Sequence, residues 1–88
     1  MFRMWSRIFK ENHLIKDTVI EDPSVDTRTH KVFRALSAST EALDISTPIW
    51  LDKNIKEFGR FSHTRFTSDN FIEQPDFDYL EIRILEED

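Results

Sequence analysis

The chain has 88 residues, one glycine, no cysteine and a net charge of −5, which is the size of one small domain. These counts exclude glycine-rich phosphate-binding loops, disulfide frameworks, thiolate metal sites and cysteine nucleophiles. The charge is uneven, because residues 1–10 and residues 53–66 each sum to +3 whereas residues 69–88 sum to −7.

The first 22 residues fit two structures. As a helix, they would place apolar side chains opposite three basic ones, as in a helix that lies on a membrane surface. As a hairpin, they would turn at Glu11-Asn12. The expected hairpin pairs are Lys10 with His13, Ile8 with Ile15 and Met4 with Val19. We favour the hairpin because residues 18–20, Thr-Val-Ile, are strongly strand-forming.

The first predicted helix follows a turn at residues 22–24. We expect it from about Thr27 to Leu43, with Asp26 as its N-cap. Residues 37–40, Ser-Ala-Ser-Thr, are poor helix formers. The second half of this helix is therefore expected to bend or fray.

A second helix is predicted from Asp52 to Phe58, after a break at residues 46–48. Its apolar positions, Ile55 and Phe58, are expected to be buried. Gly59 follows directly, and glycine tolerates the positive φ angle with which many helices end. We therefore predict that Gly59 is the C-cap of this helix.

The C-terminal third contains the clearest strand. Residues 61–77 are irregular, with residues 65–67 extended and residues 68–70 forming a turn or a helix start. Residues 79–85 then alternate strictly between apolar and polar side chains. The last strand is acidic and the first is basic, so we place the two side by side.

Together these elements predict an α+β domain that spans residues 1–88. The expected order is β-β-α-α-β, with a three-stranded, mainly antiparallel sheet and two helices packed on one of its faces.

Several stretches of the chain resemble a set of short uncharacterised bacterial proteins. These stretches are residues 27–32, 48–52, 69–73 and 77–82. The resemblance departs at residues 37–45, and it implies a free-standing bacterial cytoplasmic protein without implying an activity, a cofactor or an active site.

Neither export nor membrane insertion is expected. The longest apolar stretch without charge, residues 45–51, is far shorter than the roughly 20 residues of a membrane-spanning helix. Arg3, Arg7 and Lys10 interrupt the apolar run that a signal peptide requires. We expect a cytoplasmic protein with no membrane partner.

The histidines give little support for enzymatic chemistry. None of His13, His30 and His63 has a second histidine two to four residues away, which is the usual spacing of a metal-binding pair. We therefore name no catalytic residue, metal ligand or cofactor, and we lean against an enzyme.

A basic segment with interleaved aromatic residues is the first candidate site. Lys53, Lys56 and Arg60 share one face of the second predicted helix, and His63 and Arg65 follow it. This pattern suits single-stranded nucleic acid or a phosphate-bearing ligand, and a small enzyme could use His63 as its acid or base. The competing interpretation is a solvated helix face that the acidic C-terminal segment balances.

The second candidate site is the sheet face that two helices on the opposite side leave uncovered. In the expected register it carries six large apolar residues: Trp5, Phe9, Leu14, Ile20, Tyr79 and Leu85. Either residues 61–77 pack over this face or a partner does. We expect a non-enzymatic interaction or regulatory module that associates with itself, as a homodimer, or with another protein, and the alternative is a module that binds nucleic acid or a phosphate-bearing ligand.

Overall fold

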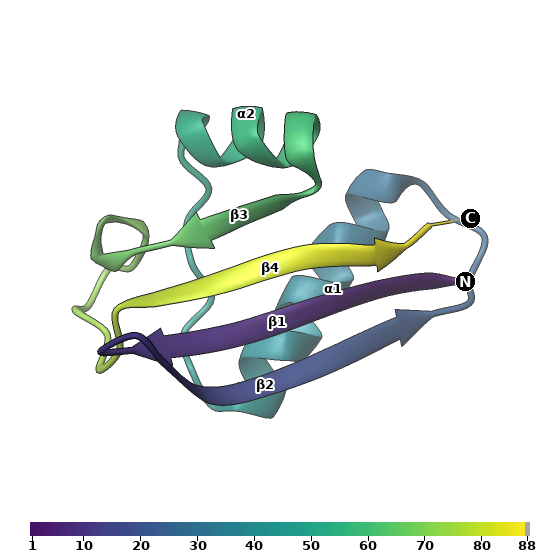
Figure 1. Cartoon of the computed structure of the whole chain (residues 1–88). Coiled ribbons are helices and arrows are strands. Elements are labelled where there is room, and N and C mark those ends of the chain that lie inside the picture. The colour runs from purple at the N-terminus through teal and green to yellow at the C-terminus, as the bar shows by residue number, and fades with distance from the viewer. Residues whose placement is uncertain (88) are drawn as a thin grey trace.

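The computed structural model describes residues 1–87 as an α+β fold in which two helices and a 3-10 turn accompany a four-stranded antiparallel sheet (Figure 1). The elements in chain order are β1 (Phe2–Lys10), β2 (His13–Asp22), α1 (Arg28–Leu43), α2 (Asp52–Phe61), β3 (His63–Phe66), the 3-10 turn Ser68–Asn70 and β4 (Tyr79–Glu86). The strand order is β2-β1-β4-β3. The predicted α+β class is confirmed, but the prediction of three strands is wrong, because the segment expected to be extended after α2 pairs with β4 as a fourth strand.

The N-terminal hairpin is confirmed, and the alternative helix over these residues is wrong. Glu11 and Asn12 both have positive φ angles, of 52° and 65°, as a two-residue turn between twisted strands requires. Lys10 pairs with His13 as predicted, but a bulge next to Ile8 shifts the rest of the register by one residue.

The bulge exchanges the two faces of β2. Met4 lies opposite Ile20, where the sequence predicted Val19, and Ile8 lies opposite Lys16, where it predicted Ile15. A shift of one residue moves every side chain to the other face of a strand. Val19 is consequently 41% exposed, whereas Ile20 packs against the core.

β4 lies between β1 and β3, so the predicted adjacency of the first and last strands is confirmed. Its alternation also holds, because Leu80 and Ile82 are fully buried beneath α1 and the loops that follow it. Glu81 lies opposite Arg7 of β1, which agrees with the charge argument for this placement.

Helix α1 begins one residue later than predicted and stays regular to its end. Thr27 is the N-cap, since its Oγ1 accepts the His30 backbone N–H at 3.2 Å. The expected fraying is wrong, because Ser39 is fully buried and its hydroxyl bonds that of Ser6 in β1 at 2.8 Å. The small serine side chains let the helix lie close to the sheet, and this packing outweighs the weak helix propensity of serine.

Helix α2 runs three residues further than predicted. It ends at Ser62, whose φ is 59° and whose backbone N–H donates to the Phe58 carbonyl at 2.9 Å. Gly59 lies inside the helix without a positive φ angle, so its predicted role as C-cap is wrong. Phe58 is buried as predicted, whereas Ile55 is 58% exposed.

The buried residues form one cluster on the face of the sheet that α1 covers. Its members are Phe2, Met4, Ile8, Val32, Ala35, Leu36, Leu43, Phe58, Phe66, Phe71, Leu80 and Ile82. Phe71 and Phe77 come from the loop between β3 and β4 and pack with this cluster. That loop therefore lies on the covered side and leaves the opposite face of the sheet bare. None of the helices in residues 1–87 is long and apolar enough to cross a membrane.

Candidate interaction surface

The surface of interest is the face of the sheet opposite α1, which we call the open face. Strand alternation and the observed registers define its members. They are Leu14, Asp17, Val19 and Glu21 from β2, Arg3, Trp5, Arg7 and Phe9 from β1, Tyr79, Glu81, Arg83 and Glu86 from β4, and His63 and Arg65 from β3.

The registers arrange these side chains in three central rows across the strands and a fourth row, Glu21, Arg3 and Glu86, at the start of β1. The middle row, in the order β2, β1, β4, β3, is Asp17, Arg7, Glu81 and Arg65. The tryptophan row on one side of it is Val19, Trp5, Arg83 and His63, and the tyrosine row on the other side is Leu14, Phe9 and Tyr79. Charge in the middle row therefore alternates in sign from one edge of the sheet to the other.

Glu81 is the centre of the charged network on this face. It is only 4% exposed, and its two oxygens form ion pairs with Arg7 and with Arg65 Nε, the latter at 3.3 Å. Burial, followed by the neighbouring cation Arg83, lowers the pKa of Arg7 below its ordinary value. A guanidinium nevertheless stays charged in proteins, so two cations share one carboxylate.

The aromatic rings of the open face are held in place by cations and by one another. Phe9 and Tyr79 stack with centroids 5.0 Å apart. The guanidinium of Arg7 lies 4.2 Å from the Trp5 ring, and that of Arg65 lies 4.6 Å from the Tyr79 ring. The Trp5 indole N–H donates to Asp17 at 2.9 Å. These rings are therefore ordered before any partner arrives.

The sequence identified most of this surface but divided it into two sites. Trp5, Phe9, Leu14 and Tyr79 lie on the open face as predicted. Leu85 is 43% exposed and lies at the irregularity between β1 and β4, where the register gives it no partner. The sixth predicted residue, Ile20, is a correction, because the bulge in β2 turns it to the covered side.

The predicted basic segment divides between two places. His63 and Arg65 lie on the open face next to β4. Arg60 reaches the edge of that face through Phe61, which stacks on His63 with centroids 5.9 Å apart. Lys53 and Lys56 are exposed on α2, which lies beyond β3 (Figure 1).

The histidines do not converge on a reactive centre. His30 Nδ1 lies 2.9 Å from Asp26 at the start of α1, whereas His13 pairs with Lys10 at the hairpin turn and His63 lies in β3. In residues 1–87, no three side chains of the metal-binding types come close enough together to hold an ion.

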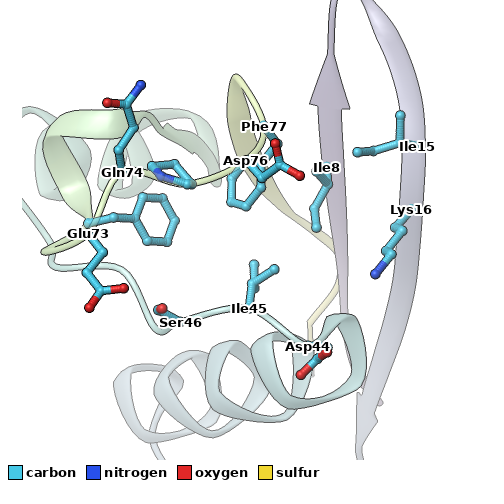
Figure 2. Close-up of a pocket in the computed structure, with 12 residues that line it drawn as sticks. Ile8, Ile15, Lys16, Asp44, Ile45, Ser46, Glu73, Gln74, Asp76 and Phe77 are labelled. Carbon is cyan, nitrogen blue, oxygen red and sulfur yellow. The ribbon is translucent and has the colours of Figure 1, made fainter.

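A cavity on the covered side was not predicted. It has a volume of about 610 Å³ and lies between the hairpin, the end of α1 and the loop before β4 (Figure 2). Its walls include Ile8, Ile45 and Phe77, and its lining also contains Lys16 and the carboxylates Asp44, Glu73 and Asp76. None of the predicted site residues lines it. Its lining residues come from segments far apart in the sequence, so no local motif could have predicted it.

A smaller groove of about 240 Å³ lies between the two helices. Phe33, Trp50, Ile55 and Phe58 line it, and Arg28 lies at one side. The indole N–H of Trp50 is buried without a hydrogen-bond partner within residues 1–87. Its nitrogen is not accessible from outside, so it offers no donor to an incoming ligand.

The fold and this surface define a small α+β domain with one face of its sheet covered and the other open. Comparisons with protein-family models, with curated proteins and with solved structures give no match to the chain. Its function is therefore argued from its own residues.

Proposed function

We propose that the protein is a non-enzymatic interaction module that associates with itself through the open face. The observation that carries this proposal is the composition of that face, which combines ordered aromatic rings with arginines and has no lysine. Tryptophan, tyrosine and arginine are the residue types enriched at the energetic centres of protein interfaces, and lysine is depleted there. The loop before β4 packs Phe71 and Phe77 into the covered side, and α2 touches the open face at its last residue, where Phe61 stacks on His63.

The charges of the open face favour a second copy over nucleic acid. Its arginines are matched in number by carboxylates, namely Asp17, Glu21, Glu81 and Glu86, the last of which pairs with Arg3. A phosphate backbone would have to displace the carboxylates that already hold Arg7 and Arg65. Nucleic-acid binding depends on net positive charge, whereas a second copy offers both signs equally.

The size of the face points to a weak, reversible dimer. Strands lie about 4.8 Å apart and rise about 3.4 Å per residue, so the 31 strand residues of the sheet cover about 500 Å² per copy. Two copies would bury about 1,000 Å² in total, at the lower limit of specific interfaces. We expect a dissociation constant in the micromolar range.

Sedimentation velocity and light scattering from about 1 to 500 μM test the proposal. We expect the mass to rise from that of a monomer towards that of a dimer. Trp5→Glu should weaken association at least tenfold, because it places a charge among the central rings. Lys53→Glu changes a charge on α2, outside the open face, and serves as the control that associates normally. A wild-type monomer at the highest concentration, or unchanged association of Trp5→Glu, would overturn the proposal.

A second candidate function is binding of a phosphate-bearing ligand or single-stranded nucleic acid at the β3 edge. It is favoured by the continuous series formed by Arg60, Phe61 and His63, because aromatic and cationic groups in alternation suit stacked bases and phosphates. Fluorescence anisotropy with a labelled oligonucleotide of about 15 nucleotides tests this function. Salt-sensitive binding that Arg60→Glu abolishes would support it, and no binding at low salt would remove it.

A further inference from the structure

We infer that two copies stack their open faces in one defined orientation, about a two-fold axis that runs parallel to the strands between β1 and β4. This inference rests on the proposed function and adds to it which residues of the second copy each row meets. Such an axis reverses the strand order, so that β2 lies over β3 of the second copy and β1 lies over β4 of the second copy. Each row then faces itself in reverse.

The middle row is complementary to its own reverse. Read across the sheet, its charges are negative, positive, negative and positive. Reversal places Asp17 over Arg65 of the second copy and Arg7 over Glu81 of the second copy. Each charge of the row therefore lies over an opposite charge. Glu81 is 4% exposed and already holds Arg7 and Arg65 of its own chain, so the outer pair of the exposed residues Asp17 and Arg65, which the two-fold axis repeats, carries the choice of orientation.

The flanking rows are compatible with the same axis. The tryptophan row places Trp5 over Arg83 of the second copy, and a guanidinium over an indole ring is a favourable pair. Within residues 1–87, Arg83 has no ion pair, so its charge is available. The tyrosine row places Phe9 over Tyr79 of the second copy, which adds a ring-to-ring contact.

The other simple arrangement is unfavourable. A two-fold axis perpendicular to the strands and through the middle row keeps the strand order and places β2 over β2 of the second copy. Asp17 would then face Asp17, and Arg65 would face Arg65. Like charges brought together in an interface cost several kcal/mol, so the charge pattern selects the parallel axis.

The twist of the sheets does not break the outer pairs. Stacked sheets lie about 30° apart, and the outer strands lie about 7 Å from the axis at a strand spacing of about 4.8 Å. The rotation displaces Asp17 from Arg65 of the second copy by about 4 Å, which a flexible arginine side chain spans. Buried ion pairs contribute little net affinity. We therefore expect the charged row to determine the orientation of the two copies and the aromatic rings to supply the affinity.

Charge reversal on the outer pair tests the orientation. Asp17→Arg alone and Arg65→Glu alone should each weaken self-association at least tenfold, because each creates two like-charge contacts per dimer. The double variant D17R/R65E should restore association to within about threefold of wild type. An equimolar mixture of the two single variants should form heterodimers for the same reason. Lys53→Glu is the control, and thermal melts of every variant report folding.

Cross-linking supplies a second readout that does not alter the charged row. The chain contains no cysteine, so introduced thiols react without background. Val19 lies over His63 of the second copy in the inferred dimer. A bismaleimide with a span of about 8 Å should therefore link a mixture of Val19→Cys and His63→Cys chains, and should link neither variant alone. The two positions are separated by two intervening strands within one chain, about 14 Å apart.

The outcomes separate the two proposals. A wild-type dimer whose D17R/R65E variant stays monomeric, or whose cysteine mixture gives no cross-link, overturns the orientation and leaves self-association standing. A wild-type chain that never associates overturns both. Restored association of the double variant together with the mixed cross-link supports both.

Discussion

The two faces of the sheet differ in how their polar side chains are hydrogen-bonded. On the covered face, the Ser6 hydroxyl donates to Ser39 of α1, and the Asn54 amide donates to Thr64 and to the Arg65 carbonyl of β3. On the open face, the polar groups pair across strands but retain capacity: Arg7 Nε is buried without a partner within residues 1–87, although the same guanidinium pairs with Glu81. If the open face associates as proposed, neighbouring residues of a strand serve folding on one side of the sheet and association on the other.

The comparison predicts that substitutions on the covered face reduce the free energy of unfolding, whereas substitutions on the open face weaken self-association. β4 offers a matched pair, since Ile82 is fully buried and Arg83 is the next residue, on the other side. Ile82→Ala should reduce the free energy of unfolding by about 2–5 kcal/mol through a cavity. Arg83→Ala should change it by less than about 0.5 kcal/mol.

Chemical denaturation of both variants at about 1 μM, where the chain is expected to be monomeric, measures this difference. Equal losses in the two variants would show that the open face also supports the fold, and the comparison would fail.

The next effect concerns the polar network beneath α2. The Asn54 amide donates to Thr64 Oγ1 and to the Arg65 carbonyl, each at 2.9 Å, and its oxygen accepts from Asn70 at 2.7 Å. Asn54→Ala leaves these partners unsatisfied in a buried site, so we expect a loss of about 2–3 kcal/mol.

A double-mutant cycle with Asn70→Ala sharpens this test. Because the two side chains bond each other, the double variant should lose less stability than the sum of the single variants. Strict additivity would mean that the two amides act independently.

A smaller effect, of opposite sign, is expected at Gly59. The residue lies inside α2 with no positive φ angle, and a Cβ added there has no heavy atom within 4 Å. Gly59→Ala should therefore stabilise the fold by about 0.5–1 kcal/mol, since alanine loses less backbone entropy in a helix. A higher melting temperature by calorimetry is the expected result, and a lower one would restore the C-cap interpretation.

The smallest expected effect is on the stability of the fold at low pH. A hydrogen bond from Ser24, then one from Arg34, lowers the pKa of Asp22 from 3.8 to about 2, and Arg34 also holds the pKa of Asp26 well below its ordinary range. Both folded-state pKa values lie below those of the unfolded chain. Their stabilisation is therefore complete above about pH 4 and is lost as the pH falls towards 2.

Acid titration of unfolding, followed by circular dichroism, measures this loss. Arg34→Met should move the acid transition to higher pH by less than about one unit, because both carboxyls lose the part of the pKa lowering that Arg34 supplies and keep the part that Ser24, Thr27 and His30 supply. An unchanged transition would show that Arg34 does not join the end of β2 to α1 energetically.

The sequence predicted those elements whose signal is local. The alternation of Leu80 and Ile82 identified β4, and the opposite charges of the first and last strands placed it correctly beside β1. The turn at Glu11-Asn12 was also local, because its residues tolerate the positive φ angles that it needs.

The errors arose where distant contacts decide the structure. A bulge beside Ile8 changes a register that simple pairing cannot foresee, and it exchanged Val19 with Ile20. Residues 37–40 stay helical because Ser39 bonds Ser6 across the interface. The open face was predicted as an apolar patch, whereas its charged middle row depends on registers of four strands that only the fold determines.

The strand order also has a consequence for the chain during synthesis. β1 is made first but lies inside the sheet, where it needs both β2 and β4. The hairpin can form early, yet one edge of β1 stays unpaired until residues 79–86 have been made. Until β4 has been made, the chain therefore exposes the nine-residue edge of β1, and an unpaired strand edge of this kind is open to mispairing and aggregation.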